Sequence, residues 1–301
     1  MTTVIIIDSK IGKICIMKTE YYNSAHLNDI FMKTIVFATD FSKGSNKAAE
    51  SAAHVAVKTK AKLIIFHAYR FVMPYESEMS EIAITSKELE KHSFRSLKRL
   101  QQRLVKKYPE NLNIEIQVKE GLVTDTLKQL LVDTNADLLV MGSVGDSPLA
   151  AKYFGSIATS MIHQTKTPLL LVPPNTKFSF FNNVVLGLDF QYEIDAQTLQ
   201  KTVNILQDLE ATVNLLTIAE ASDKAKESGV KIRELLKNVP HTFSVIEGNE
   251  FADSVLAFAK SNHADLIITF PRKHNLFELF FKESNTERLA FNDEIPILAV
   301  V

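Results

Sequence analysis

The chain has 301 residues with a net charge of −1, and its 46% hydrophobic and 23% charged residues are typical of globular proteins. This length suits two domains better than one, the single cysteine excludes a disulfide framework or cysteine-rich metal site, and the near-neutral charge argues against a dedicated nucleic-acid binder. No apolar run reaches the roughly 18 residues of a membrane helix. Because Asp8 interrupts the apolar run at 4–7, a secretory signal is not expected. We expect a cytoplasmic protein that binds neither membrane nor nucleic acid.

Residues 1–31 match no later segment, and we treat them as an N-terminal extension without an assigned function, with a hairpin as one option. From residue 32 on, strand and helix patterns alternate. Strands are predicted at 34–39, 62–69, 113–121, 136–143 and 168–172, and helices at 42–60, 80–107, 123–135 and 154–165. Ser42 and Thr124 are candidate N-caps. The alternation predicts a parallel, doubly wound sheet, and the continuous apolar strands indicate that both its faces are covered.

The same pattern occurs twice along the chain. Three pairs of segments align in the same order: 35–42 with 184–191, 135–145 with 263–273, and 167–172 with 295–300. A long internal repeat of this kind indicates a tandem of one domain. We therefore predict a first domain at 32–174 and a second at 180–301, joined by the turn-forming residues of 173–183.

Charge is unevenly distributed between the halves. Residues 1–179 carry 23 Lys and Arg against 17 Asp and Glu, whereas residues 180–301 carry 11 against 18. The positive half is the better candidate for an anionic ligand. The alternative is that this uneven charge reflects random variation of surface residues and has no functional meaning.

Three of the nine glycines fall within 142–155, directly after an apolar strand and before the next helix. In doubly wound sheets, ligands bind beyond the carboxyl ends of the strands, near the switch in strand order. Gly142 is expected to let the chain turn, and Gly145 to bring backbone N–H groups close to phosphate oxygens. Gly155 and Ser156 open a helix whose N-terminus attracts anions. The segment therefore predicts a phosphate cradle, although it lacks the lysine of a Walker motif.

The spacing Gly142-x2-Gly145-x9-Gly155-Ser156, with TDFS after the first strand, resembles the ATP-binding form of the universal stress protein family. The resemblance extends over nearly all of 32–301. It implies an α/β fold of two tandem Rossmann-like domains, each a doubly wound, mainly parallel five-stranded sheet flanked by helices. It further implies a regulatory stress-response protein that binds ATP, alone or with Mg²⁺, in the first domain, with little or no hydrolysis.

The resemblance also implies which residues bind the nucleotide. They are Ala38, Asp40, Ala68, Met141, Gly142, Gly145, Gly155, Ser156 and Ile157. The first three would surround the nucleoside, the next two would contact ribose and base, and the last four would hold the phosphates. From the residues alone, Asp40 has an alternative role in capping the helix at Ser42, and His67 is expected to be a buried or half-buried structural histidine.

The second domain departs from this pattern. Phe270, Lys273 and Glu283 stand at the glycine positions, and only Asp189 and Ser284 are retained. We therefore expect adenine nucleotide as a partner of the first domain only. Two alternatives stay open: a nucleotide-independent dimerisation scaffold, and a slow ATP-hydrolysing or adenylate-transfer enzyme.

The last strands of the two domains are short, apolar and terminal, at 168–172 and 296–300. Each would expose an unpaired edge if left alone. We expect them to pair the domains as a pseudo-dimer within the chain, with a homodimer as a further option. The sequence identifies no catalytic residue, no metal ligands and no protein partner.

Overall fold

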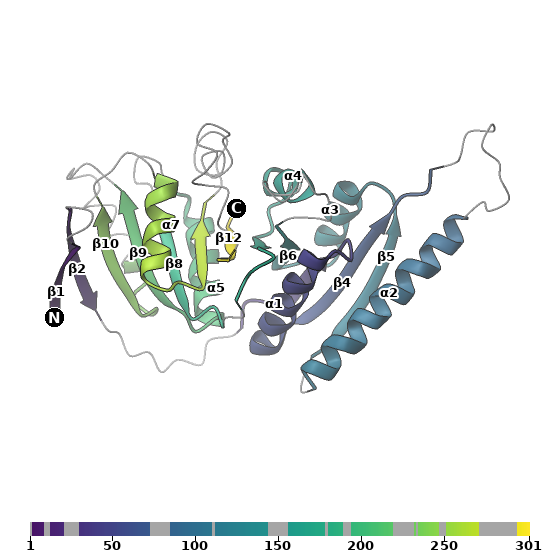
Figure 1. Cartoon of the computed structure of the whole chain (residues 1–301), viewed down its shortest axis with the longest axis horizontal. Helices are drawn as coiled ribbons and strands as arrows, with labels where there is room; N and C mark the ends of the chain where they lie inside the picture. Colours follow the sequence, from purple (N-terminus) through teal and green to yellow (C-terminus); the bar gives the residue numbers. More distant parts are fainter. Residues whose placement is uncertain are drawn as a thin grey trace. The chain divides into compact units, whose positions relative to one another are not determined.

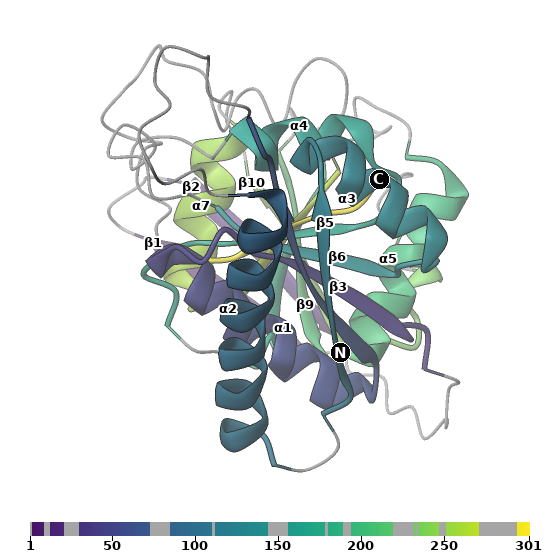
Figure 2. The same ribbon diagram turned by 90° about the vertical axis from the view of Figure 1, so that its right-hand side faces the viewer.

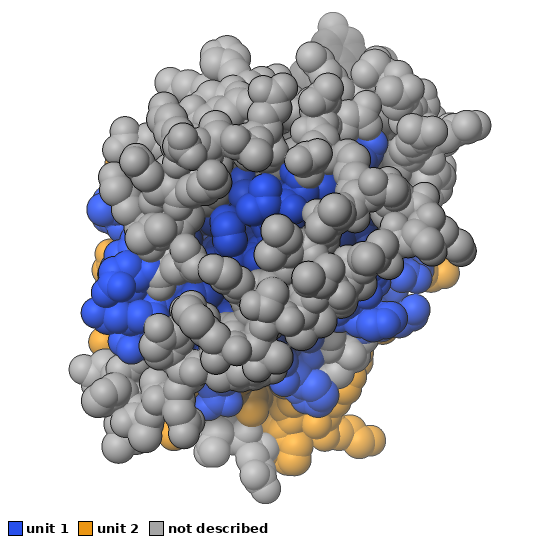
Figure 3. Space-filling view, turned by 90° about the vertical axis from the view of Figure 1, so that its left-hand side faces the viewer, with its two compact units in different colours: residues 1–31, 175–301 blue, residues 32–174 orange. Residues whose placement is uncertain are grey.

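The computed structural model describes residues 2–8, 13–20, 30–72, 85–109, 112–143, 156–177, 180–188, 194–218, 232, 234–246, 251–270 and 294–301. The chain divides into two compact units, shown in Figure 3. We call residues 32–174 (orange) the glycine-motif unit, and residues 1–31 with 175–301 (blue) the hairpin unit. The N-terminal extension thus clusters with the residues of the second predicted domain.

The glycine-motif unit is a five-stranded parallel sheet covered on both faces, as predicted. Its strands are β3 (Thr34–Ala38), β4 (Lys62–Tyr69), β5 (Ile114–Glu120), β6 (Leu138–Gly142) and β7 (Leu169–Val172). They follow the order β7-β6-β3-β4-β5, and all neighbours are parallel. Its helices are α1 (Lys43–Thr59), α2 (Ser86–Lys107), α3 (Val123–Asp133) and α4 (Ser156–Gln164). Right-handed crossovers place α1 and α2 on one face and α3 and α4 on the other (Figure 2).

Local signals explain where the first two helices begin. Ser42 is the N-cap of α1, as predicted, and its Oγ accepts the N–H of Ser45 at 3.1 Å. Thr85 and Glu88 form a capping box at the start of α2. Residues 80–84, where the sequence predicts the start of this helix, lie outside the described part of the chain.

The predicted N-cap Thr124 is wrong. Helix α3 already begins at Val123, and its N-cap Leu122 makes no side-chain hydrogen bond. The turn before it depends on Gly121, whose φ of +142° suits glycine. The hydroxyl of Thr126 donates to the Leu122 carbonyl at 2.9 Å, inside the first turn. The backbone turn, rather than a capping side chain, therefore sets the start of α3.

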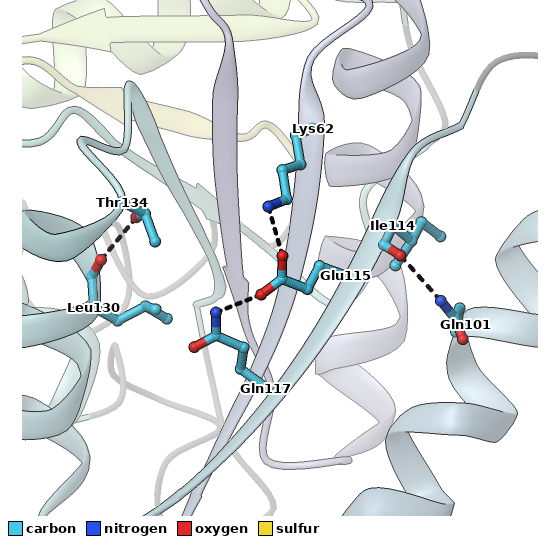
Figure 4. A network of polar contacts seen from close by, with 7 residues as sticks. All are labelled: Lys62, Gln101, Ile114, Glu115, Gln117, Leu130 and Thr134. Atoms are coloured by element: carbon cyan, nitrogen blue, oxygen red, sulfur yellow. Dashed lines mark hydrogen bonds and ion pairs between the residues drawn. The ribbon is translucent and has the colours of Figure 1, made fainter.

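Strand β5 stands at one end of this sheet and carries polar side chains (Figure 4). Lys62 Nζ lies 2.5 Å from a Glu115 carboxylate oxygen, and Gln117 donates to the other oxygen at 2.6 Å. These bonds hold the pKa of Glu115 below its usual value. On α2, Gln101 donates to the Ile114 carbonyl at 3.1 Å and links the helix to the strand.

The hairpin unit repeats this strand order and extends it (Figure 1). Its elements are β1 (Thr2–Asp8), β2 (Lys13–Glu20), β8 (Asn183–Leu188), α5 (Ala196–Asp208), β9 (Thr212–Ile218), β10 (His241–Ile246), α7 (Phe251–Ser261), β11 (Leu266–Thr269) and β12 (Ile297–Ala299). The parallel strands run β10-β9-β8-β11-β12, the same order as β5-β4-β3-β6-β7. The N-terminal hairpin of β1 and β2 adds two antiparallel strands beyond β10.

A matching aspartate ties the fourth parallel strand to the first in each unit. Asp137, just before β6, accepts the backbone N–H groups of 33–34 at 2.8 and 2.9 Å. Asp265, just before β11, accepts those of 182–183 at 3.0 and 3.1 Å. The two aspartates align in the predicted internal repeat, so the repeat is matched by the same local contact in both units.

No helix in the described part of the chain combines the length and hydropathy needed to cross a membrane.

Candidate functional site

The candidate site lies where the strand order of the glycine-motif unit reverses. Strands β3 and β6 are neighbours, but α1 leaves β3 toward one face and α4 follows β6 on the other. Diverging connections of this kind open a crevice at the carboxyl edge of the sheet. The glycine motif begins at this edge because Gly142 is the last residue of β6.

Not every predicted phosphate-binding residue lies in the described part of the chain. Gly145 and Gly155 lie outside it. Ser156 is the first described residue of α4, so a helix follows the glycine motif as predicted, while 154–155, where the sequence predicts its start, lie outside the described part. Ile157 follows in the first turn and is half-buried. Helix α4 therefore presents its N-terminal turn at the end of the glycine segment, as an anion site requires.

The residues expected around the nucleoside come from three neighbouring strands. Ala38 ends β3 opposite Met141 of β6, and their exposed fractions are only 8% and 7%. Ala68, near the end of β4, is half-buried. With Ala38 and Met141 so little exposed, these two positions offer a ligand mainly their backbone.

Gly142 faces α1 rather than open space. A Cβ built on it would lie 3.4 Å from both Cα and N of Ser45, and 3.5 Å from the carbonyl carbon of Gly44. These are backbone atoms, which cannot rotate away as a flexible side chain can. A methyl group would therefore lie in ordinary contact with the first turn of α1, whereas a larger side chain would meet backbone atoms that cannot move aside.

Asp40 lies in a tightly bonded turn between β3 and α1. The hydroxyls of Thr39 and Ser45 hydrogen-bond at 2.6 Å, and the Thr39 hydroxyl oxygen accepts the N–H of Phe41 at 3.0 Å. One carboxylate oxygen of Asp40 accepts the N–H of Ser42 at 3.0 Å. The other oxygen accepts no hydrogen bond from the described residues, and the side chain is exposed. Asp40 thus shapes the turn, while Ser42 is the N-cap of the helix.

Phe41 and His67 form an aromatic pair beside this turn. Their ring centroids lie 4.4 Å apart at an interplanar angle of 38°. His67 is half-buried, as predicted, and its Nδ1 donates to the Thr39 carbonyl at 2.7 Å. Burial lowers the pKa of His67 below its usual value, as does the charge of His92, against the opposing effects of the Thr39 bond and Asp40. The net effect favours the neutral form of His67.

Phe41 lies beside the candidate site and was not singled out from the sequence. Its φ of 65° lies in the left-handed region, which bulky residues rarely adopt, and its side chain is 36% exposed. The signal in the sequence is weak: a phenylalanine directly follows the aspartate of TDFS, where a turn residue is expected.

Asp40 is the described residue of the candidate site that could contact a magnesium ion. The described residues contain no group of three or more His, Cys, Asp or Glu side chains that could hold a metal ion. Asp40 supplies one carboxylate oxygen at the crevice, and Mg²⁺ commonly combines one or two carboxylates with phosphate oxygens and water. Among the described residues, Asp40 thus meets one part of such a ligand set.

The hairpin unit differs at the equivalent edge. Phe270 stands at the end of β11 where the other unit has Gly142, and its side chain is 4% exposed. Asp189, Lys273, Glu283 and Ser284, which complete the comparison of the two domains, lie outside the described residues.

Comparison with known proteins identifies the family. Residues 32–173 match the Universal stress protein family. The universal stress proteins MT1672 and Rv1636, from two strains of Mycobacterium tuberculosis, are each 31% identical over 145 residues, covering 46% of this chain and 95% of theirs.

Solved structures agree with the fold. A universal stress protein from Archaeoglobus fulgidus has a TM-score of 0.64 at 14% identity, covering 88% of this chain and 97% of that one. A universal stress protein in complex with cAMP is 30% identical over 47% of this chain and 97% of its own, with a TM-score of 0.37. The chain belongs to the universal stress protein family, because residues 32–173 match the family and the curated relatives are 31% identical over 95% of their length.

Proposed function

We propose that the glycine-motif unit binds ATP at the switch point between β3 and β6, and that the protein acts as a nucleotide-dependent regulator with little or no hydrolysis. The observation that carries this proposal is the pairing of β3 with β6 at the switch in strand order. The exposed Asp40 follows β3, and β6 ends at Gly142, after which the sequence continues through the glycine motif to α4.

The phosphates are assigned to the β6 side of the crevice. The first N–H groups of a helix have no intrahelical partner, and the helix dipole adds a partial positive charge there. Gly145 and Gly155 allow the backbone between β6 and α4 to approach the phosphate oxygens closely. The surplus of basic residues in 1–179 adds a long-range attraction for the triphosphate.

The nucleoside is assigned to the β4 side of the crevice. Neighbouring strands lie about 4.8 Å apart, so β6 and β4, on either side of β3, are separated by roughly 10 Å. A nucleoside bridges a separation of this size when its phosphates lie at α4. Asp40, between the two ends, is placed to accept hydrogen bonds from ribose hydroxyls or to share a Mg²⁺ ion with the phosphates.

A regulatory role is favoured over a catalytic one, because the glycine segment lacks a group that catalysis would require. It contains no G-K-[ST] lysine to stabilise charge on a leaving phosphate. Phosphoryl transfer requires an oriented nucleophile and charge stabilisation in addition to nucleotide binding. Slow hydrolysis and a nucleotide-independent scaffold are the alternatives that an experiment has to separate.

Mass spectrometry of nucleotide released from the purified protein, followed by calorimetric titration with ATP, tests the proposal. We expect intact ATP and one binding site per chain. Release of ADP or AMP would favour an enzyme, and absence of binding would favour a scaffold. cAMP is titrated in parallel, because the solved relative described above binds it.

Two matched variants locate the site. Gly155→Val should weaken ATP binding at least tenfold, about 1.4 kcal/mol, because its branched side chain would occupy the approach of the phosphates. Glu283→Val, at the position that aligns with Gly155 in the second domain, should leave the affinity unchanged. Both proteins should keep a native circular dichroism spectrum. A stoichiometry near two, or equal affinities for wild type and Gly155→Val, would refute the assignment.

We also propose that residues 180–301 form a second universal stress protein domain that has lost nucleotide binding. The shared strand order and the matching aspartates Asp137 and Asp265 support this. Pairing through the strands at 168–172 and 296–300, within the chain or in a homodimer, stays a prediction. Light scattering coupled to size-exclusion chromatography measures the number of chains.

A further inference from the structure

We propose that Phe41 is the residue on which the base of the bound nucleotide stacks, and that His67 holds the Phe41 ring in position for this contact. The inference rests on the proposed nucleotide site and adds the residue that recognises the base. The ligand class is a nucleoside or nucleotide with a flat aromatic base.

The first observation is where Phe41 lies. It follows β3 by three residues, and its ring contacts His67 of β4, so it stands on the side of β3 that faces away from β6. The phosphates are assigned to the β6 side, at the start of α4. A nucleotide that reaches across β3 therefore brings its base to the Phe41–His67 pair.

The second observation is that Phe41 is exposed and that its backbone has a strained conformation. A phenylalanine at φ 65° is strained, because its Cβ crowds the backbone in the left-handed region. Phe181 in the hairpin unit also has a left-handed φ, of 53°, but is only 2% exposed, so the combination of strain and exposure distinguishes Phe41. Here the Thr39 hydroxyl oxygen, which accepts the Phe41 N–H at 3.0 Å, holds the turn in place.

The third observation is that His67 is fixed from two sides. Its Nδ1 donates to the Thr39 carbonyl at 2.7 Å, which sets the tautomer and the orientation of the ring. The ring then lies against Phe41 at a centroid distance of 4.4 Å. Because His67 supports the Phe41 ring and the residue is still 36% exposed, we infer that ring surface remains for a base.

Substitution of Phe41 separates this role from a structural one. Phe41→Ala should weaken ATP binding by about 5- to 100-fold, the range found when stacking residues are replaced by alanine. Phe41→Trp should retain binding, because a larger ring still offers a stacking face. Phe41→Gly should lose affinity like alanine but keep the melting temperature of the wild type or exceed it, since glycine adopts this φ without strain.

Phe94 provides the matched control. It is the other exposed phenylalanine in the described part of the glycine-motif unit, it is 51% exposed, and it lies on α2 away from the switch point. Phe94→Ala removes the same number of atoms from an exposed position. It should leave ATP affinity unchanged.

The choice of ligand separates the base contact from the phosphate contacts. The fold-loss caused by Phe41→Ala should be the same for ATP and for adenosine, and inorganic tripolyphosphate should bind the variant and the wild type equally. Gly155→Val should instead weaken tripolyphosphate. Equal ATP affinity in wild type and Phe41→Ala, or a loss seen equally with tripolyphosphate, would overturn the stacking role.

His67 is tested as a positioning residue. His67→Phe keeps an aromatic ring beside Phe41 but removes the bond to the Thr39 carbonyl, so it should retain part of the affinity that His67→Ala loses. Equal losses would show that the ring contact does not position Phe41. If wild-type protein binds no ATP at all, the proposed function fails instead, and that outcome is distinct from a failure of Phe41 alone.

Discussion

Gly142 allows packing and ligand binding to be separated by two substitutions at one position. A Cβ at this site would lie 3.4 Å from backbone atoms of Ser45, at the short end of ordinary contact. The φ of Gly142 lies outside the left-handed region, so alanine would not be strained there. Restricting the unfolded chain gains about 0.4–1 kcal/mol for alanine, which offsets the cost of the tight contact. We expect Gly142→Ala to change the free energy of unfolding by less than about 1 kcal/mol.

Gly142→Val should behave differently. Its two Cγ atoms extend about 1.5 Å beyond Cβ, and the space in that direction is already filled by the backbone of Gly44 and Ser45. Either α1 shifts away from β6 or the valine adopts an unfavourable rotamer, and such overpacking costs about 1–3 kcal/mol. The expected difference between the valine and alanine variants is therefore about 2 kcal/mol.

Equilibrium unfolding in urea, followed by circular dichroism, measures both changes as shifts in the midpoint at constant slope. A valine variant as stable as wild type would refute the packing argument, as would an alanine variant that loses more than about 2 kcal/mol. ATP titration of the same proteins adds a second result. If Gly142→Ala stays stable but loses nucleotide, the ligand and not the packing against α1 requires glycine here.

Two further predictions concern stability. Gly121→Ala should lower the free energy of unfolding in urea by at least about 1 kcal/mol, because the φ of Gly121 is +142°. The loss should be smaller in a Thr126→Ser background, which removes the Cγ2 atom that lies 2.8 Å from the new Cβ. A Gly121→Ala variant as stable as wild type would contradict this. Asp195→Ala should cost about 1 kcal/mol at pH 7, because the Asp195 carboxylate caps α5 by accepting the Thr198 N–H and hydroxyl at 2.9 and 2.7 Å. These bonds lower the pKa of Asp195 in the folded protein. The extra stability of wild type over Asp195→Ala is therefore fully present above the pKa of the unfolded chain, and should be lost as pH falls through the lower pKa of the folded protein. A stability difference that stays constant down to acid pH would refute this.

Several parts of the fold could be predicted because the physics behind them is local. The apolar residues 63–66 form the buried centre of β4, and Ser42 precedes an alanine-rich segment that favours a helix. The start of α3 could not be predicted in the same way. Thr124 has the right chemistry for a cap, but the turn at Gly121 decides where the helix begins.

Strand pairing between distant parts of the chain could not be predicted from the sequence either. A hairpin in residues 1–31 was one option, yet nothing local indicates that β2 pairs with β10, more than 200 residues away. The same limit holds at the candidate site. The glycine spacing points to β6 and α4, but the contact of Phe41 with His67 depends on a backbone turn and on the neighbouring strand. Neither the turn nor the strand contact can be recognised from the spacing of residues in the sequence.

The N-terminal hairpin gives the two copies of the fold different ways to protect the same sheet edge. In the glycine-motif unit, β5 keeps its outer position and carries the charged and polar side chains Glu115, Gln117 and Lys119, which discourage pairing with another chain. In the hairpin unit, β10 instead hydrogen-bonds to β2. A shortened chain starting at Met32 would leave β10 with a row of unpaired backbone groups, a template for self-association. We therefore expect the N-terminal hairpin, which matches neither repeat, to limit self-association through β10.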